Sequence, residues 1–176
     1  MEIYLDNSAT TRVLPSVAGK INKIYLDCYG NPSSLHRKGL AAEEEREEAR
    51  KIIASSINAK KGEIIFTSGG TESNNLAILG YLKKNPRMGK KIIISAGEHA
   101  SVSNIGAFLE GEGYEVVMLP VSSEGIPDYA FLSSAVDENT ALVSVMTVNN
   151  ETGYITDTAK IKQIIAEKNK NTVFMS

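Results

Sequence analysis

Short apolar runs recur along the chain and predict buried strands. The runs are rich in Ile and Val and are mostly continuous, without the alternation of a strand that faces water on one side. This pattern is typical of largely parallel strands that are covered on both faces. The predicted strands are residues 63–67, 91–95, 115–119, 141–146 and 172–175.

Stretches between these runs predict helices at about residues 71–84, 100–112, 129–136 and 157–168. Repeated strand–helix–strand units predict an α/β fold, a layered and mostly parallel sheet with right-handed crossovers. Ligands bind at the carboxyl ends of the strands in such sheets. Polar residues that follow a predicted strand are therefore the first candidates for a site.

The first 60 residues follow a different pattern. A polar, extended start leads to a predicted amphipathic helix at about 14–26, a turn-rich segment at 29–34 and a long charged helix at about 36–58. We predict that residues 1–60 form an N-terminal arm that packs onto a sheet domain of residues 61–176. The charge run within the long helix predicts a solvated face with ion pairs three and four residues apart.

Composition and charge narrow the classes of function. The 19 basic and 21 acidic residues give a net charge of −2, so no strong field attracts nucleic acid or an acidic membrane. No apolar run approaches the ~20 residues of a membrane helix, and the start at Met1 lacks the features of a signal peptide. Cys28 is the single cysteine, which excludes an internal disulfide framework and fits a reducing compartment. We expect a cytoplasmic protein.

A glycine turn between a predicted strand and a predicted helix is the first candidate for a ligand site. Residues 66–75 read FTSGGTESNN, which places Gly69 and Gly70 before the helix. Free N–H groups of a first helical turn bind anions, and glycines allow close approach and positive φ. Thr71 and Ser73 add hydroxyl donors. We predict a phosphate-binding turn, but neither a P-loop nor a dinucleotide site, because the P-loop lysine and the dinucleotide spacing are lacking.

Polar residues after two other predicted strands leave alternatives open. His99 follows the strand at 91–95 and could serve as a general acid/base, as a flat stacking surface or as a helix-start residue with a structural hydrogen bond. Asn149 and Asn150 follow the strand at 141–146 and could hold a ligand oxygen or close a turn.

Two other side chains that could be reactive, those of His36 and Cys28, are interpreted as structural. His36 opens the long charged helix, where we expect a structural or capping role. Cys28 has no histidine or basic residue beside it, so we expect a small hydrophobic side chain rather than a nucleophile. The sequence has no paired Cys/His spacing, so we predict no metal site.

Five segments together carry a resemblance to a known family. They read YLDNSATT at 4–11, YGNPSSLH at 29–36, FTSGGTESNN at 66–75, EH at 98–99 and VNNETG at 148–153. In this order they closely resemble the N-terminal part of cysteine desulfurases of the NifS/IscS type, within the class V aminotransferase group, over essentially all 176 residues.

The resemblance implies an incomplete large domain of a fold type I enzyme that uses pyridoxal 5′-phosphate (PLP). Such a domain is a three-layer α/β sandwich, a mostly parallel sheet with helices on both faces. The implied reaction removes sulfur from L-cysteine, releases L-alanine and leaves a persulfide for iron–sulfur cluster or thio-cofactor assembly.

The resemblance also implies roles for individual residues. Gly70 and Thr71 match the phosphate-binding pair, the first of which is more often alanine in the family. His99 matches the catalytic histidine that stacks on the PLP ring and assists proton transfer. Asn150 matches the asparagine that hydrogen-bonds the phenolic oxygen of the cofactor.

The implied partners complete this interpretation. Ala9 and Thr10 would line the substrate side, where L-cysteine binds. Family members are homodimers that pass sulfur to an acceptor or scaffold protein, and neither nucleic acid nor a membrane is implied.

Several functional residues of the family have no counterpart in the 176 residues. They are the aspartate at the pyridine nitrogen, the Schiff-base lysine, the mobile-loop cysteine and the arginine for the substrate carboxylate. The aspartate would directly follow Ser176, and Cys28 lies in the wrong place to replace the loop cysteine. We predict that the chain alone is inactive, cannot attach PLP through the usual lysine, and is marginally stable or self-associated.

Other interpretations stay open at this stage. A selenocysteine lyase or an aminotransferase of the same class would share these segments. A truncated, non-catalytic binding or dimerisation module would retain only the phosphate site. A generic nucleotide-binding α/β domain is disfavoured by the missing P-loop lysine and by the order of the five segments.

Overall fold

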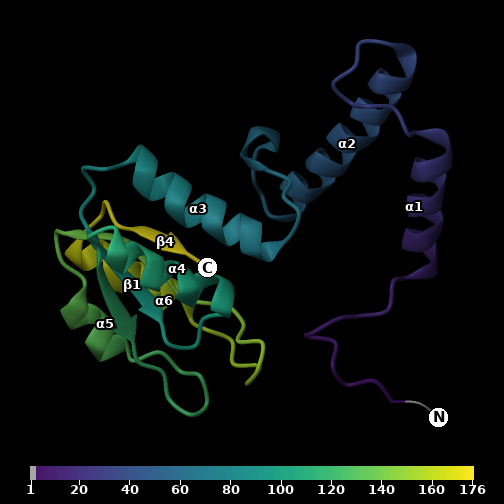
Figure 1. Cartoon of the computed structure of the whole chain (residues 1–176). Coiled ribbons are helices and arrows are strands. Elements are labelled where there is room, and N and C mark those ends of the chain that lie inside the picture. The colour runs from purple at the N-terminus through teal and green to yellow at the C-terminus, as the bar shows by residue number, and fades with distance from the viewer. Residues whose placement is uncertain (1–2) are drawn as a thin grey trace. The chain divides into compact units, whose positions relative to one another are not determined.

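The computed structural model describes residues 3–176, so Met1 and Glu2 of the predicted N-terminal arm lie outside the described residues (Figure 1). The chain divides into two compact units, Met1–Phe66 and Thr67–Ser176. The boundary between these units falls after Phe66, and each unit is described by itself. The division into an arm of residues 1–60 and a sheet domain of residues 61–176 stays a prediction. The packing of the arm onto the sheet domain stays a prediction.

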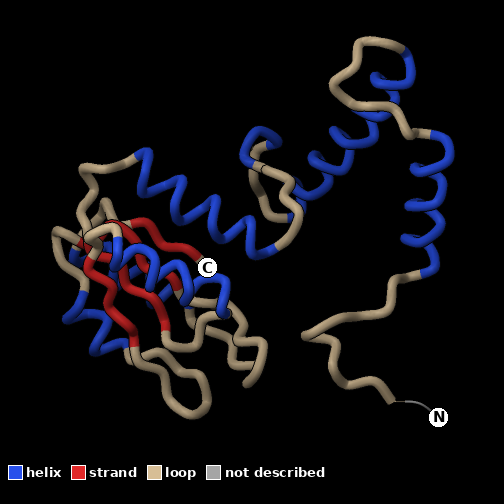
Figure 2. Tube along the Cα trace, viewed as in Figure 1, coloured by secondary structure: helices blue, strands red, loops and turns tan. Residues whose placement is uncertain are grey.

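A four-stranded parallel sheet is the centre of the second unit (Figure 2). Its strands are β1 (Lys91–Ser95), β2 (Glu115–Leu119), β3 (Thr140–Ser144) and β4 (Val173–Met175). They are arranged in the order β2-β1-β3-β4, and every neighbouring pair is parallel. In register, Ile93 of β1 lies between Val117 of β2 and Val143 of β3. These strands lie within a few residues of four of the predicted runs.

Four helices of the second unit accompany this sheet. They are α3 (Gly70–Lys84), α4 (Ala100–Gly111), α5 (Tyr129–Ala135) and α6 (Thr158–Lys168). The predicted helix boundaries agree with these to within one residue. Asp128 and Asp157 begin α5 and α6 by accepting hydrogen bonds from backbone N–H groups of the first turn, at 2.9 and 3.0 Å.

The sheet is covered on both faces, as the α/β interpretation predicts. Successive side chains of a strand point to opposite faces, and β1 accordingly contributes to two separate cores. Ile92 and Ile94 pack with residues of α3 and α4 in one core. Ile93 packs with residues of α5 and α6 in the other core. The second unit is thus a three-layer α/β sandwich.

The predicted strand at 63–67 is not formed. Residues Lys61–Glu63 form a short 3-10 helix (η1), and residues 64–67 have no regular secondary structure. Ile65 and Phe66 are 69% and 46% exposed. None of the four strands pairs with this segment, and an apolar run without a neighbouring strand cannot complete its backbone hydrogen bonds as a sheet.

The first unit consists of two longer helices, α1 (Pro15–Asp27) and α2 (Arg37–Ser56), followed by η1. His36 caps α2, because its Nδ1 accepts a hydrogen bond from the N–H of Gly39 at 3.2 Å. The expected capping role of His36 is therefore confirmed. Among residues 3–176, no helix has both the length and the apolar character needed to cross a membrane.

The charge run of α2 forms ion pairs three residues apart on a face that is only partly exposed. The expected pairs four residues apart are absent from the described residues 3–176. Glu47 pairs with Arg50 at 3.3 Å, and Glu48 pairs with Lys51 at 3.8 Å. Helical pairs at this spacing each contribute about 0.2–0.5 kcal/mol.

Truncation of a residue on the face of the sheet that α5 and α6 cover tests the layered core. Ile93 is fully buried between the sheet and the helices α5 and α6. We expect Ile93→Ala to lower the free energy of unfolding by about 2–5 kcal/mol, because it leaves a cavity that the core fills only partly. The same truncation at Ile155, which is 70% exposed, should change it by less than about 0.5 kcal/mol. Denaturant unfolding measures both, and equal effects would contradict the assignment of the core.

Candidate functional site

The carboxyl edge of the sheet carries a pocket of about 450 Å³. Its lining comes from the segments that follow β1 and β3, from the end of β4 and from α3. His99 follows β1, Ser144 ends β3, Met175 ends β4, and Asn74 projects from the second turn of α3. The pocket therefore lies where ligands bind in parallel α/β sheets.

The first turn of α3 presents unpaired backbone donors. Gly69 is the N-cap and Gly70 is the first helical residue. Among residues 3–176, no hydrogen bond engages the backbone N–H of Gly70, Thr71 or Glu72. These three N–H groups and the positive end of the helix dipole form an environment that favours an anion.

The two glycines do not use the positive φ that glycine permits. Gly69 has φ 168° and ψ 179°, an extended conformation open to any residue, and Gly70 is helical. A Cβ added at either glycine would meet nothing within 4 Å. The small side chains thus leave open space beside the unpaired donors, which is what close approach of an anionic group requires.

The carboxylate of Glu72, on α3, stabilises this turn through hydrogen bonds. Glu72 Oε2 accepts hydrogen bonds from the N–H and the hydroxyl of Ser68, at 2.7 and 2.6 Å. The Ser68 hydroxyl bond, followed by the backbone bond, holds the pKa of Glu72 below its usual value. The turn is closed further by a 2.6 Å hydrogen bond between the hydroxyls of Thr67 and Ser73.

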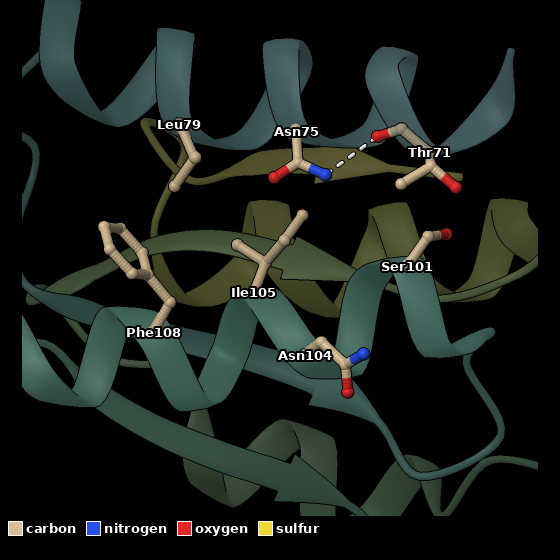
Figure 3. Close-up of a pocket in the computed structure, with 7 residues that line it drawn as sticks. All are labelled: Thr71, Asn75, Leu79, Ser101, Asn104, Ile105 and Phe108. Atoms are coloured by element: carbon tan, nitrogen blue, oxygen red, sulfur yellow. Dashed lines mark hydrogen bonds between the residues drawn. The ribbon is translucent and has the colours of Figure 1, made fainter.

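Thr71 lies at one end of a second pocket, of about 350 Å³, between α3 and α4 (Figure 3). Its carbonyl oxygen accepts a hydrogen bond from Asn75 Nδ2 at 2.8 Å. Thr71 and Ser101 face each other at the polar end, and Leu79 and Phe108 lie at the apolar end. The exposed Thr71 side chain is thus available at the start of α3 beside the unpaired N–H groups.

His99 is both a helix cap and a lining residue of the site. Its Nδ1 accepts a hydrogen bond from the N–H of Ser101 at 3.1 Å, which caps α4. The imidazole is exposed and lines the 450 Å³ pocket and a neighbouring pocket of about 520 Å³. The structural hydrogen bond weighed from the sequence is therefore present, and it leaves the ring at the surface of both pockets.

The two adjacent asparagines have different roles. Asn149 closes the turn, because its Oδ1 accepts bonds from the N–H groups of Glu151 and Thr152, at 3.0 and 2.8 Å. Its Nδ2 donates to the carbonyl oxygen of Gly97 at 3.0 Å. Asn150 is exposed in the 520 Å³ pocket, and among residues 3–176 no hydrogen bond engages its side chain. Asn149 thus holds the loop, while Asn150 is available for a ligand.

Glu98 is a residue for which the sequence analysis gave no role. Its carboxylate accepts a 2.9 Å hydrogen bond from the hydroxyl of Ser144, which is 1% exposed. Burial raises the pKa of Glu98, and the Ser144 bond together with the N–H groups of His99 and Met146 partly opposes this rise. The carboxylate thereby ties the loop after β1 to the end of β3. A glutamate directly before a candidate histidine was the only signal in the sequence, and it does not reveal burial.

Ala9 and Thr10 lie in a turn of the first unit. The N–H groups of both residues bond to the carbonyl oxygen of Asp6 at 3.3 Å. The hydroxyl of Tyr4 donates to the carbonyl oxygen of Thr10 at 3.0 Å. Gly70, Thr71, His99 and Asn150 belong to the second unit, so the structure does not place Ala9 and Thr10 relative to them.

Comparisons with known proteins identify relatives of this chain by sequence and by structure. The family described as aminotransferase class-V matches residues 3–175. A relative named cysteine desulfurase IscS 1, from Archaeoglobus fulgidus, is 43% identical over 162 residues, which cover 92% of this chain and 42% of the relative. A solved structure of a NifS-like protein superposes with a TM-score of 0.95 at 36% identity and covers 99% of this chain and 48% of that one. Another, of SspA in complex with cysteine, has a TM-score of 0.89 at 33% identity and covers 97% and 49%.

The chain therefore belongs to the aminotransferase class-V family. Within this family it is similar to the N-terminal part of cysteine desulfurases of the NifS/IscS type, as the sequence resemblance predicts. The family implies PLP, and the fold is that of an incomplete fold type I large domain. The chain spans less than half the length of the curated relatives it matches.

The raised pKa of the half-buried Glu98 carboxylate leads to a prediction about the pH dependence of stability. A carboxyl group whose pKa is raised on folding binds its proton more tightly in the folded state, so it stabilises the fold in acid. This stabilisation is lost as the pH rises from the usual value of 4.5 through the raised pKa. We expect the free energy of unfolding of the wild type, relative to Glu98→Gln, to decline over this window. Urea unfolding at a series of pH values measures the difference.

Ser144→Ala supplies a second variant for the same measurement. It removes a hydrogen bond to the charged carboxylate, so the decline should move to higher pH. A difference between wild type and Glu98→Gln that is independent of pH would show that Glu98 is not held as described.

Proposed function

We propose that this chain is the N-terminal segment of a PLP-dependent cysteine desulfurase and supplies half of the cofactor site. The complete enzyme would convert L-cysteine to L-alanine and transfer the sulfur as a persulfide for iron–sulfur cluster or thio-cofactor assembly. The observation that carries this proposal is the set of unpaired N–H groups at Gly70, Thr71 and Glu72. They begin a helix whose Asn74 lines the same pocket as His99.

The residues at the start of α3 fit the phosphate group of PLP. Three backbone donors, the helix dipole and the exposed Thr71 hydroxyl favour a dianion there, and Gly69 and Gly70 leave space for it. Bound PLP would supply an electron sink for the bond changes of the substrate. The phosphate end would thus be held by this chain's own backbone.

His99 and Asn150 would act on the remainder of the cofactor. The exposed imidazole of His99 offers a flat surface for stacking, and its Nε2 atom is free to interact with a ligand. Asn150 carries an amide without a partner among residues 3–176 in the pocket that His99 also lines, and we assign it to the phenolic oxygen. Asn149, through its bond to Gly97, would hold Asn150 in place.

L-Cysteine is the substrate that we propose, and the support is a similar solved structure described as a complex with cysteine. We assign Ala9 and Thr10 to the substrate side. A homodimer, a sulfur-acceptor or scaffold protein and a cytoplasmic location complete the proposal and rest on the family resemblance.

The 176 residues by themselves should lack desulfurase activity. None of their lysines matches the Schiff-base lysine of the family, and Cys28 does not match the loop cysteine. We expect no release of alanine from L-cysteine above a protein-free control containing PLP, measured by chromatography of the amino acids. Turnover by the purified chain would contradict this proposal.

A proline substitution selectively tests the phosphate cradle, which is the set of unpaired N–H groups of Gly70, Thr71 and Glu72. Gly70→Pro removes one N–H donor at the first helical position, where proline is well accommodated. Loss of one hydrogen bond to a charged group costs about 1.5–3 kcal/mol, so PLP should bind about 10- to 150-fold more weakly. Equilibrium dialysis with PLP measures the affinity, and pyridoxal, which has no phosphate, should lose much less.

Gly70→Ala is the matched control for this substitution. It keeps the N–H group, and its Cβ would meet nothing within 4 Å, so the affinity for PLP should change less than about threefold. Equal losses in Gly70→Pro and Gly70→Ala, or equal losses of PLP and pyridoxal, would refute the assignment of the cradle.

A further inference from the structure

The proton position on His99 can be read from its neighbours. The Nδ1 atom of His99 accepts from the backbone N–H of Ser101 at 3.1 Å. A backbone N–H is always a donor, so Nδ1 must present its lone pair. A neutral imidazole carries one proton, and that proton must then sit on Nε2.

The hydroxyl of Ser101 reinforces this arrangement. It lies 2.8 Å from the Nδ1 of His99, and the Ser101 side chain is almost fully buried, with 9% exposure. With Nδ1 as an acceptor, the hydroxyl proton points at it, so the hydroxyl and the backbone N–H share the single lone pair of Nδ1. The hydroxyl oxygen in turn accepts a hydrogen bond from Asn74 Nδ2 at 2.8 Å.

The three side chains therefore form a directed chain from α3 to the site. Asn74 donates to Ser101, and Ser101 donates to His99 through both its hydroxyl and its backbone N–H. Asn74 lies 27 residues before Ser101 in the sequence. Among residues 3–176, no hydrogen bond engages the Nε2 atom of His99.

We propose that Ser101 and Asn74 are positioning residues that hold His99 as the neutral tautomer with its proton on Nε2. His99 then meets a ligand as a hydrogen-bond donor at Nε2, and accepting a proton there would require the tautomer to change. That change would put a proton on Nδ1 and break both bonds from Ser101. The tautomer concerns this chain alone, while its importance for chemistry rests on the proposed function.

Nitrogen-15 NMR of the histidine rings tests the tautomer directly. The spectrum of the labelled 176-residue chain is recorded at about pH 8.5, where an unperturbed histidine is neutral. We expect His99 to show a protonated Nε2 and an unprotonated Nδ1. A predominant Nδ1–H tautomer, or rapid exchange between both forms in equal amounts, would overturn the proposal.

Substitutions then separate the side chains from the backbone cap. Ser101→Ala removes the hydroxyl but keeps the backbone N–H, and one hydrogen bond of ordinary strength is lost. We expect the ratio of the Nε2–H to the Nδ1–H form of His99 to fall by about two- to tenfold. Asn74→Ala should lower this ratio by a smaller factor. Ser101→Thr keeps a hydroxyl, so it should show the ratio of the wild type.

The chain supplies two controls. Asn75→Ala removes a neighbouring amide that donates to the Thr71 carbonyl oxygen, so it should leave the His99 signals unchanged. His36 caps α2 through its own Nδ1 and should keep its signals in every variant. An unchanged His99 in both Ser101→Ala and Asn74→Ala would overturn the positioning role.

Unfolding and failure of the proposed function give different results. A variant whose second unit unfolds loses the capped signal of His99 together with the folded signals of that unit. The other variant, on the other helix, then decides the matter. Weak PLP binding by a chain whose His99 shows the Nε2–H form would refute the proposed function and leave the tautomer assignment intact. PLP binding by a chain whose His99 shows the Nδ1–H form would refute the tautomer assignment and leave the proposed function intact.

Discussion

The parallel pairing of β1 with both β2 and β3 is the constraint on which the rest of the structure depends. Parallel neighbours need a crossover between them, and the crossing helices cover both faces of the sheet. The isoleucines of β1 are consequently buried from two sides in separate cores. The same direction of the strands brings His99, Ser144 and Met175 to one edge, where they line one pocket.

Most of the fold could be predicted because its strands are continuous apolar runs and its helices begin at recognisable polar residues. The segment at 63–67 shows where this reasoning ends. Ile65 and Phe66 have the composition of a strand, but a strand needs a neighbour, and none of the four described strands pairs with it. Glycine permits positive φ without requiring it, and the turn at Gly69 is extended.

The site could be predicted only in part. The glycine turn, His99 and Asn150 follow from motifs that are local in the sequence. The hydrogen bonds that Ser144 donates to Glu98 and Asn74 donates to Ser101 join residues 46 and 27 positions apart, and no local pattern indicates such pairs. The different roles of Asn149 and Asn150 also depend on a distant contact, the bond from Asn149 to the Gly97 carbonyl oxygen.

The two hydrogen bonds from Ser68 to the Glu72 carboxylate have a consequence for how an anion would bind. A carboxylate near the start of α3 carries the same sign of charge as a phosphate, so it weakens the attraction somewhat. It also ties down Ser68, the residue before the N-cap, without any ligand. Ordering a flexible loop on binding opposes affinity. The turn is thus preorganised, and little of the binding free energy is consumed in shaping the cradle.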